Sequence, residues 1–459
     1  MRRSQTHIAA ALVLAACVAH APALTAVFQF DDYAVIVDNP SVHSLAAWWA
    51  SMPGIRPLLK LSYALNHALW PGTSGFHAAN MLVHVTNTLL VWRLSRHWLP
   101  HLGLPAASAA PLAALLFAVH PATTETVAYA SGRSISLAAL FMLAAWLADA
   151  RHVASRPASW SIASPLLFAV ALGVRETSLV VPLAFVLLAL CAPTHSSAGE
   201  RLRRYAGHAL VVLIGTGCFV IVPGYVRFFA TSLATRDAAD QLAGQLGAQA
   251  YLATRPLLGA HTNIDPPAQA ILDSAPPMFV AVLLAVLAIA AWRLRRRVPW
   301  AAFAIGWYVL MLAPSNSLLP RLDLANDRHL YLALLGPAWI VAGTLARLPS
   351  RRLASVLGVA LAGALGIATW QRSLDYRSES ALWMASVAAA PANARAWTNL
   401  GYAWRRLGDR ERAHDAYLCA LAFDRRNEQA ILNLDALGKP AVARPRSPRA
   451  CAPEAFAAP

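Results

Sequence analysis

Charged residues are scarce in this sequence of 459 residues. Only 13% of the residues are Asp, Glu, Lys or Arg, whereas 58% are hydrophobic and the mean hydropathy is +0.48. Soluble domains carry about 25% charged residues, so the composition argues against a soluble globular protein and predicts a membrane protein. Lysine is nearly absent, since Lys60 and Lys439 are its only copies, and arginine supplies almost all of the positive charge.

Clustered cysteines are also missing. The five cysteines show no Cys-x-x-Cys pair and no spacing typical of a metal site. Three of them lie in apolar runs, where cysteine usually packs as a small hydrophobic residue. These patterns indicate no cofactor and no metal ligands, and a divalent metal is left open.

Long apolar runs are the main feature that is present. A helix needs about 20 apolar residues to cross a bilayer. The first run follows Met-Arg-Arg and has the features of a secretory signal, but we expect an uncleaved anchor, because cleavage would leave two acidic residues near a free N-terminus. Eleven segments are candidate spans, near 8–27, 76–94, 106–120, 134–149, 159–174, 177–193, 207–223, 277–293, 299–314, 329–346 and 353–370.

The arginines indicate the orientation of these segments. Alternate connections, starting with the N-terminus, hold sixteen arginines and two acidic residues, and the opposite connections hold nine basic and eleven acidic residues. Because positive charge collects in cytoplasmic loops, we predict a cytoplasmic N-terminus and an extracytoplasmic C-terminus. The net charge of +16 is then a topology signal and does not indicate a nucleic-acid partner.

Two of the predicted outer connections are long, at about 28–75 and 224–276. The first begins with the adjacent carboxylates Asp31 and Asp32, at the outer edge of the first span. Apolar residues then follow at near-helical spacing, which predicts an amphipathic helix in the membrane interface near 45–68. The second connection predicts a helix from about 237 to 254 that ends before Pro256.

Polar residues also interrupt the apolar runs near the outer face. Ionisable groups within or beside spans are costly and usually functional, and ordinary interfacial charge is the alternative interpretation. They concentrate in "HPATTETVAYASGRS" at 120–134, in "SNSLLPRLDLANDRHLY" at 315–331 and in the pair Arg175–Glu176.

One predicted helix carries a polar stripe. In "GFHAANMLVHVTN", His77, Asn80, His84 and Asn87 recur at spacings that place them on one face. Such a stripe on a spanning helix faces protein or water. It predicts either hydrogen bonding between helices or the wall of a cavity, and metal ligation is the weaker interpretation.

The residues after the last span match a 34-residue tetratricopeptide pattern. The matching positions are Trp397, Leu400, Gly401, Trp404, Gly408, Ala413, Tyr417 and Ala420. We therefore predict a transmembrane domain over 1–371, a repeat region over 372–436 and a disordered, Pro- and Ala-rich tail over 437–459. Repeats of this type usually bind peptides or proteins.

The sequence resembles a known family. "FQFDDYAVIVDNPSV", "RPLLKLSYALNHALWPGTSGFHAANMLVHVTNTLLVWRL", "LLFAVHPATTETVAYASGRSISLAALF", "RETSLVVPL" and "DRHLYLALLG" resemble the transmembrane and tetratricopeptide-repeat O-mannosyltransferase-like proteins, over most of 28–435. The resemblance implies an all-α polytopic fold of the C-type glycosyltransferases, here of the bacterial type and in the inner (plasma) membrane. It also implies a sugar donor on a polyprenyl-phosphate carrier, and an acidic catalytic motif that falls on Asp31–Asp32.

The chemistry of such a transfer suggests roles for the other polar residues. A carboxylate of Asp31 or Asp32 is the candidate base for the acceptor hydroxyl, and two adjacent carboxylates are expected to raise one another's proton affinity. Arginines are the candidates for binding the donor phosphate, with Arg328 first, followed by Arg133 and Arg175. The candidates for positioning the sugar or acceptor are His120, Glu125, Tyr129, His77, Glu176 and Asp327.

Two other functions remain open at this point. A transporter or flippase of lipid-linked sugars predicts ionisable groups at mid-membrane and an internal repeat, and a non-enzymatic scaffold would act through the tetratricopeptide repeats. As partners we expect the lipid-linked donor, the membrane, and a protein or glycan acceptor that the repeats could contact.

Overall fold

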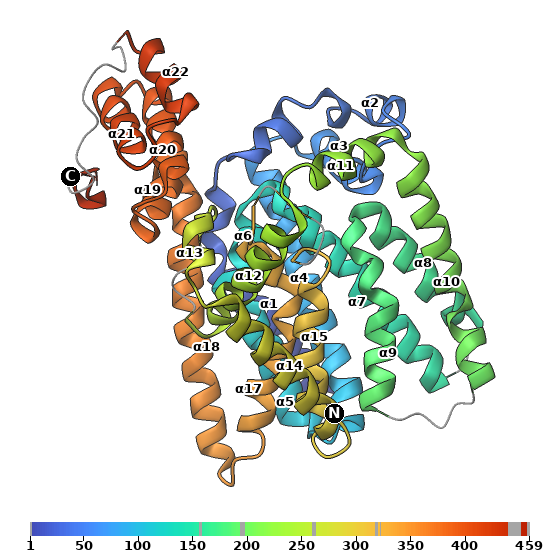
Figure 1. The fold of residues 1–459 in the computed structure, drawn as a ribbon. Coiled ribbons are helices and arrows are strands. Elements are labelled where there is room, and N and C mark those ends of the chain that lie inside the picture. The colour runs from blue at the N-terminus through green and yellow to red at the C-terminus, as the bar shows by residue number, and fades with distance from the viewer. Residues whose placement is uncertain are drawn as a thin grey trace.

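The structure is a computed structural model. It describes residues 2–155, 158–192, 198–258, 263–316, 320–321, 323–438 and 451–456, and these are helical with no strand among them. The all-α prediction is therefore confirmed for the described residues. The chain forms a bundle of upright helices with a smaller group of helices at one end, as Figure 1 shows.

Each of the eleven predicted apolar segments falls on a helix. The helices are α1 (Arg2–Ala19), α4 (Thr73–His101), α5 (Ala106–Ala118), α7 (Arg133–Ser155), α8 (Ala158–Val174), α9 (Val181–Cys191), α10 (Ala198–Ile221), α14 (Pro277–Leu294), α15 (Pro299–Leu312), α17 (Leu335–Leu345) and α18 (Arg351–Leu374).

Fewer of these helices are long enough to cross a membrane on their own. Within the described residues, four stretches have the required length and hydropathy: Ala130–Ala150, Arg204–Ile221, Pro277–Leu294 and Arg351–Arg377. A fifth arises if α5 and Pro121–Ala128, which meet at a bend of 55°, form one broken span. Five further apolar helices have only 10–17 residues, short of the roughly 20 that a bilayer requires. Several apolar helices thus support a membrane protein, and the count of eleven crossings stays a prediction.

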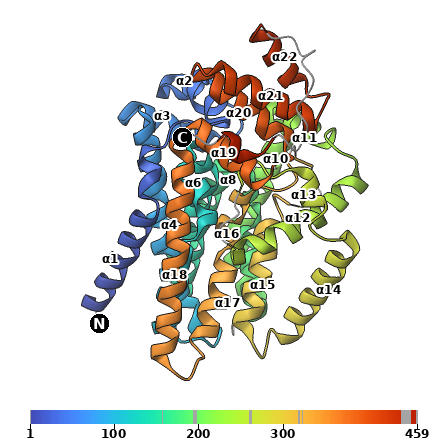
Figure 2. The same ribbon diagram turned by 90° about the vertical axis from the view of Figure 1, so that its left-hand side faces the viewer.

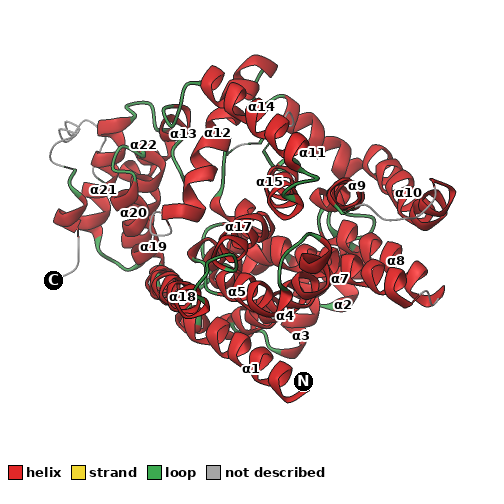
Figure 3. Cartoon of the chain, turned by 90° about the horizontal axis from the view of Figure 1, so that it is seen from below, coloured by secondary structure: helices red, strands yellow, loops and turns green. Residues whose placement is uncertain are grey.

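The helices differ in how much protein surrounds them. In the 18-residue apolar window of Ala130–Ala150, which overlaps α7, 61% of the residues are buried, compared with 6% in Pro277–Leu294, which is α14. Figure 3 shows α4, α5, α7, α15 and α17 gathered in the middle, with α1, α10, α14 and α18 towards the edge. The apolar side chains of α14 that protein leaves exposed are those that a surrounding lipid would cover.

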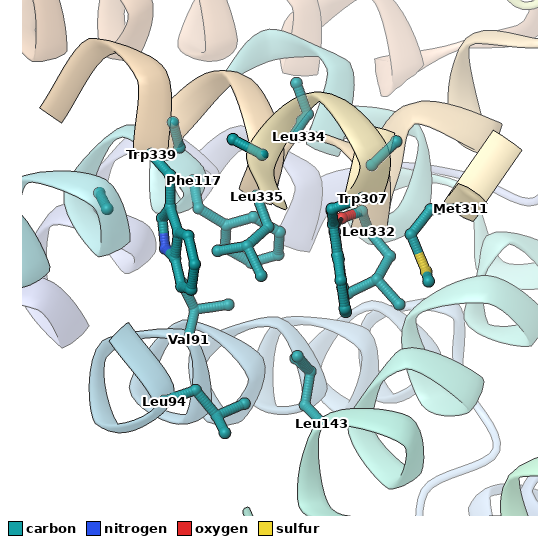
Figure 4. Packing of buried hydrophobic residues seen from close by; sticks show 14 of the residues in the cluster. Val91, Leu94, Phe117, Leu143, Trp307, Met311, Leu332, Leu334, Leu335 and Trp339 are labelled. Carbon is teal, nitrogen blue, oxygen red and sulfur yellow. Dashed lines mark hydrogen bonds between the residues drawn. The ribbon is translucent and has the colours of Figure 1, made fainter. Parts of the chain in front are cut away.

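Aromatic and aliphatic side chains fill the centre of the bundle. Trp146 stacks on Trp307 with ring centroids 4.8 Å apart, and both belong to one large cluster of buried residues. Figure 4 shows Trp307, Trp339 and Phe117 meeting aliphatic side chains from neighbouring helices. The indole N–H groups of Trp339 and Trp307 donate to the Ser95 hydroxyl (2.8 Å) and the Leu332 carbonyl (2.9 Å), so both rings are buried with their polar atoms satisfied.

The polar stripe of α4 faces this protein interior. His77, Asn80, His84 and Asn87 are all fully buried. His84 Nδ1 and Asn87 Nδ2 lie 2.9 and 3.0 Å from the Tyr331 hydroxyl. Asn80 Nδ2 donates to the Tyr129 carbonyl at 3.0 Å. Hydrogen bonding to other parts of the bundle is therefore the outcome for Asn80, His84 and Asn87. Both ring nitrogens of His77, in contrast, lack a hydrogen-bond partner within the described residues.

The short helices α2 (Leu45–Ala50), α3 (Pro57–Leu69) and α11 (Pro223–Leu233) cover one end of the bundle (Figure 1). The described fold also contains α6 (Thr124–Ala128), α12 (Ala238–Leu258), α13 (Ala268–Leu272) and α16 (Leu330–Ala333). The predicted interfacial helix near 45–68 is in fact the pair α2 and α3. The helix α12 continues past Pro256 to Leu258, four residues beyond the predicted end at about 254, because a proline in the last turn removes only one hydrogen bond.

Four further helices pack beside one another at the same end. They are α19 (Glu379–Ala389), α20 (Ala394–Arg406), α21 (Arg410–Phe423) and α22 (Glu428–Ala436). Gly401 of α20 lies against Tyr417 of α21, where a Cβ atom would come within 2.6 Å of the ring. Figure 2 shows this group at the end of the bundle opposite the N-terminus.

The predicted tail at 437–459 lies largely outside the described residues. Of its described part, Pro453–Phe456 is a 3₁₀-helix that contacts α19. Cys451 forms a disulfide with Cys419 of α21, and Phe456 packs edge-to-face on Trp397 with the centroids 5.0 Å apart.

Candidate functional site

The two adjacent aspartates have different environments. Asp32 is fully buried and accepts hydrogen bonds from the backbone N–H groups of Gln29 (3.0 Å), Ser131 (2.7 Å) and Ala130 (3.4 Å). Burial raises the pKa of Asp32 to about 7, although the hydrogen bonds from Gln29 and Ser131 act to lower it. Burial, and not repulsion from the neighbouring carboxylate, is therefore the cause of the shift, and Asp32 joins its own segment to the turn at 130–131.

Asp31 is oriented differently. It is partly exposed, and its backbone N–H donates to the Tyr129 hydroxyl at 2.8 Å. Asp31 and Tyr129 both line a cavity of about 480 Å³, whereas Asp32 does not. Of the two carboxylates, Asp31 is thus the one that a molecule in the cavity can reach.

The cavity lies where α3, α7 and α11 meet the segments around 31, 320–321 and 323–329, at the end of the bundle covered by the short helices (Figure 1). Its wall is partly apolar, with Val35, Leu59, Phe228 and Pro320, and partly polar. Four arginines line it: Arg56, Arg175, Arg321 and Arg328. Two carboxylates, Asp31 and Asp323, share the same wall.

Three of these four arginines are near a carboxylate. Arg56 Nε donates to Glu176 Oε2 at 2.9 Å, and Arg321 Nη2 lies 3.8 Å from Glu176 Oε1. Arg328 Nη1 donates to Glu125 Oε1 at 2.8 Å.

Arg175 is the exception. Its Nη1 donates to the Ser134 hydroxyl at 2.9 Å, and no carboxylate of the described residues forms an ion pair with it. It is buried, and its neighbour Glu176 acts on its charge but forms an ion pair with Arg56 instead. A buried guanidinium without an ion-paired anion is costly. An anionic group in the cavity would supply that partner.

The other predicted site residues lie behind the cavity wall. Arg133 is buried, and its guanidinium donates to Asn80 Oδ1 (2.7 Å), Asn66 Oδ1 (2.7 Å) and the Phe76 carbonyl (2.9 Å). His77 is fully buried in α4. Neither residue lines the cavity, so the structure does not bring them to Asp31.

His120 and Asp327 also sit outside the cavity lining. His120 Nε2 contacts the Pro256 carbonyl at 3.2 Å, which ties α12 to the turn after α5. Asp327 is buried and accepts from the backbone N–H of Asn263 at 2.6 Å. Burial raises the pKa of Asp327 to about 7.

Several cavity residues are not among the sequence candidates. Arg321, Asp323 and His329 line the cavity and come from the polar segment 315–331, so the sequence signal was present but could not rank its members. Thr231 and Ser232 come from α11, and Thr235 follows its end. Nothing in their local sequence distinguishes these residues from ordinary interfacial residues. No group of three or more His, Cys, Asp or Glu side chains suited to a metal ion occurs within the described part of the chain.

The chain matches no family model and no solved structure. It is 26% identical, over 84% of its length, to protein O-mannosyl-transferase Tmtc3 of Drosophila melanogaster, and it covers 51% of that protein. It is similar to the protein O-mannosyl-transferases.

Two further relatives carry the same name. Over 41% of the chain it is 34% identical to TMTC1 of Mus musculus, and over 46% it is 29% identical to Tmtc2 of Drosophila melanogaster. These matches confirm the resemblance seen in the sequence. The chain spans between 22% and 51% of the length of these three relatives.

Proposed function

We propose that the protein is a C-type glycosyltransferase. It moves a sugar, mannose-like, from a polyprenyl-phosphate carrier to a hydroxyl of an extracytoplasmic acceptor. The observation that carries the proposal is that an accessible carboxylate, Asp31, and a guanidinium without a carboxylate partner, Arg175, line one cavity. The similarity to protein O-mannosyl-transferases supports the reaction class.

The residues of the cavity divide the chemistry between them. Asp31 accepts the proton of the acceptor hydroxyl while the oxygen of that hydroxyl bonds to the anomeric carbon of the sugar. The bond from that carbon to the phosphate oxygen breaks, and negative charge develops on the departing polyprenyl phosphate. Arg175 and Arg328 stabilise this charge, because guanidinium groups form paired, charge-assisted hydrogen bonds with phosphate.

The buried candidates act by holding these groups in place. Asp32 and Tyr129 fix the segment of Asp31 from two directions. Glu125 orients Arg328, and Glu176 holds Arg56 at the rim. We assign His77, His120, Arg133 and Asp327 to the support of this framework, since each is buried and outside the cavity lining.

The membrane topology belongs to the same proposal. We place the cavity on the extracytoplasmic side of a bacterial inner membrane, with the N-terminus in the cytoplasm and the tetratricopeptide repeats at 372–436 outside. The arginine asymmetry supports this, as does the position of α19–α22 at the end opposite the N-terminus. The disulfide between Cys419 and Cys451 is also typical of an oxidising compartment.

Substituting the two aspartates tests the proposal. Asp31→Asn should lower the turnover of a labelled polyprenyl-phosphate sugar in reconstituted membranes by about 100-fold or more, because it removes the base. Asp32→Asn should chiefly lower the melting temperature, because asparagine offers one oxygen where three backbone N–H groups now donate.

The exposed Asp38 is the matched control, and Asp38→Asn should change neither turnover nor melting temperature. Full turnover in Asp31→Asn would remove the catalytic assignment.

A further inference from the structure

The helices α19 and α20 contact the short segment that carries Asp31. We propose that Trp383 and Arg406 are positioning residues for Asp31, so that these helices complete the site as well as meeting the acceptor. The inference rests on the proposed function. Two residues that precede Asp31 donate hydrogen bonds to the Tyr376 carbonyl just before α19. The donors are Val27 N (3.3 Å) and Gln29 Nε2 (3.0 Å).

The residue immediately before Asp31 has a strained backbone. Phe30 has a φ of 42°, in the left-handed region that an L-residue other than glycine rarely adopts. Its ring packs edge-to-face on Trp383 of α19, with centroids 5.5 Å apart. The contact with Trp383 holds Phe30 in a backbone conformation that the segment would not keep by itself. The backbone conformation of Phe30 sets the direction in which the chain enters Asp31.

A second contact lies on the other side of Asp31. Arg406 Nη1 of α20 donates to the Tyr33 hydroxyl at 2.7 Å and to Glu379 Oε1 at 3.0 Å. The same guanidinium lies over the Tyr33 ring, 4.9 Å from its centroid. The segment is therefore attached to the C-terminal helices on both sides of the carboxylate, while Asp32 attaches it to the transmembrane bundle.

The same helix also holds the far rim of the cavity. Arg395 of α20 donates to Asp265 Oδ2 and to Asp323 Oδ1, each at 2.8 Å. Asn393 Nδ2 donates to the Asp265 carbonyl at 2.9 Å. Because Asp323 lines the cavity, α20 joins the segments of Asp265 and Asp323 at its edge. A helix that only delivered an acceptor would not need these contacts.

The experiment compares Trp383→Ala and Arg406→Met with the conservative variants Trp383→Phe and Arg406→Lys. A misplaced base lowers kcat steeply, so we expect kcat to fall about tenfold or more in the first two, with the KM for donor nearly unchanged. The fall should be equal with a short serine- and threonine-containing peptide and with the membrane proteins of a deletion strain as acceptors. The conservative variants should recover most of the loss.

Arg405→Met is the matched control, because Arg405 neighbours Arg406 but contacts the Tyr402 ring (5.2 Å) instead. Hydrogen–deuterium exchange of residues 27–35 should accelerate in Trp383→Ala and Arg406→Met and stay unchanged in Arg405→Met. The inference would be overturned if hydrogen exchange were unchanged in Trp383→Ala and Arg406→Met. It would also be overturned if the only effect of these variants were a higher KM for the large acceptors. Unchanged turnover in a parallel Asp31→Asn sample would instead overturn the proposed function. The exchange result would still show whether Trp383 and Arg406 hold residues 27–35 in place.

Discussion

At the residue scale, the two adjacent aspartates differ in their surroundings. Asp31 faces a cavity that arginines line, and Asp32 is fully buried among backbone N–H groups. Successive side chains of a turn point in different directions, so neighbouring positions separate a carboxylate that lines the cavity from one that is buried. The sequence could name the pair as candidates for the base but could not choose between its members.

Asp327 provides a prediction at this scale. One of its carboxylate oxygens has no hydrogen-bond partner in the described structure, and burial raises its pKa to about 7, above the value of about 3.9 in an unfolded chain. A raised carboxyl pKa means that the folded state holds the proton more tightly, so this group lowers stability as the pH rises from about 4 to about 7.

We therefore expect Asp327→Asn to remove part of the decline in melting temperature between pH 5 and pH 8. The melting temperature of the variant relative to the wild type should rise from pH 5 to pH 8. The measurement is thermal unfolding in detergent at both values. Parallel curves for the two proteins would contradict the assignment.

At the element scale, a segment rich in polar residues is buried. The stretch 120–134 has the composition of an outer loop, yet every residue from 116 to 130 is buried. It forms a bend after α5 and then α6, and Gly132 lies so close to α6 that a Cβ atom would come within 2.5 Å of the Glu125 carbonyl. Hydrogen bonds inside the bundle replace water for these groups, which lets Glu125 and Tyr129 reach the site.

The disulfide gives a prediction for the C-terminal helices. It closes a loop across 32 positions between Cys419 and Cys451, and a cross-link of this size is worth about 2–4 kcal/mol. Cys451→Ser should therefore speed hydrogen exchange in α20 and α21, and peptide mapping without reductant should detect the linked pair in the wild type.

Cys218→Ser is the control, since Cys218 is exposed and forms no disulfide. Rapid alkylation of both Cys419 and Cys451 in the unreduced, folded protein would contradict the pairing.

At the scale of the whole molecule, the two terminal parts of the chain are far apart. The N-terminus and the group α19–α22 lie at opposite ends of the bundle (Figures 1 and 2), and the cavity lies at the C-terminal end. The contacts of α20 with Asp265 and Asp323 join the helical group to the bundle, so the two parts form one surface around the cavity.

Labelling of introduced cysteines tests the topology. In a version without the native cysteines, Asp38→Cys should react with a membrane-impermeant maleimide in intact spheroplasts. Arg296→Cys, at the opposite end and also exposed, should react only after permeabilisation. Both expected labelling results follow from the uneven distribution of arginine between the two sides of the membrane. The reverse pattern would place the cavity in the cytoplasm and leave the proposed reaction on the wrong side of the membrane.

The sequence by itself determined the helical class, the positions of the apolar helices and the acidic pair. Those features are local, because runs of apolar residues and repeated spacings act over single helices. It also marked Arg175, Glu176 and Arg328, since charge is rare in an apolar chain. Sequence could not count the crossings, because length alone does not tell a short buried helix from a span.

Only the tertiary structure decided which polar groups share a space. Arg133 and Arg175 look alike in the sequence, but one bonds to neighbouring helices and the other lines the cavity. The contact of Trp383 with Phe30 joins residues that are hundreds of positions apart. Such pairings depend on how the helices pack, and packing is a property of the whole chain that no local pattern records.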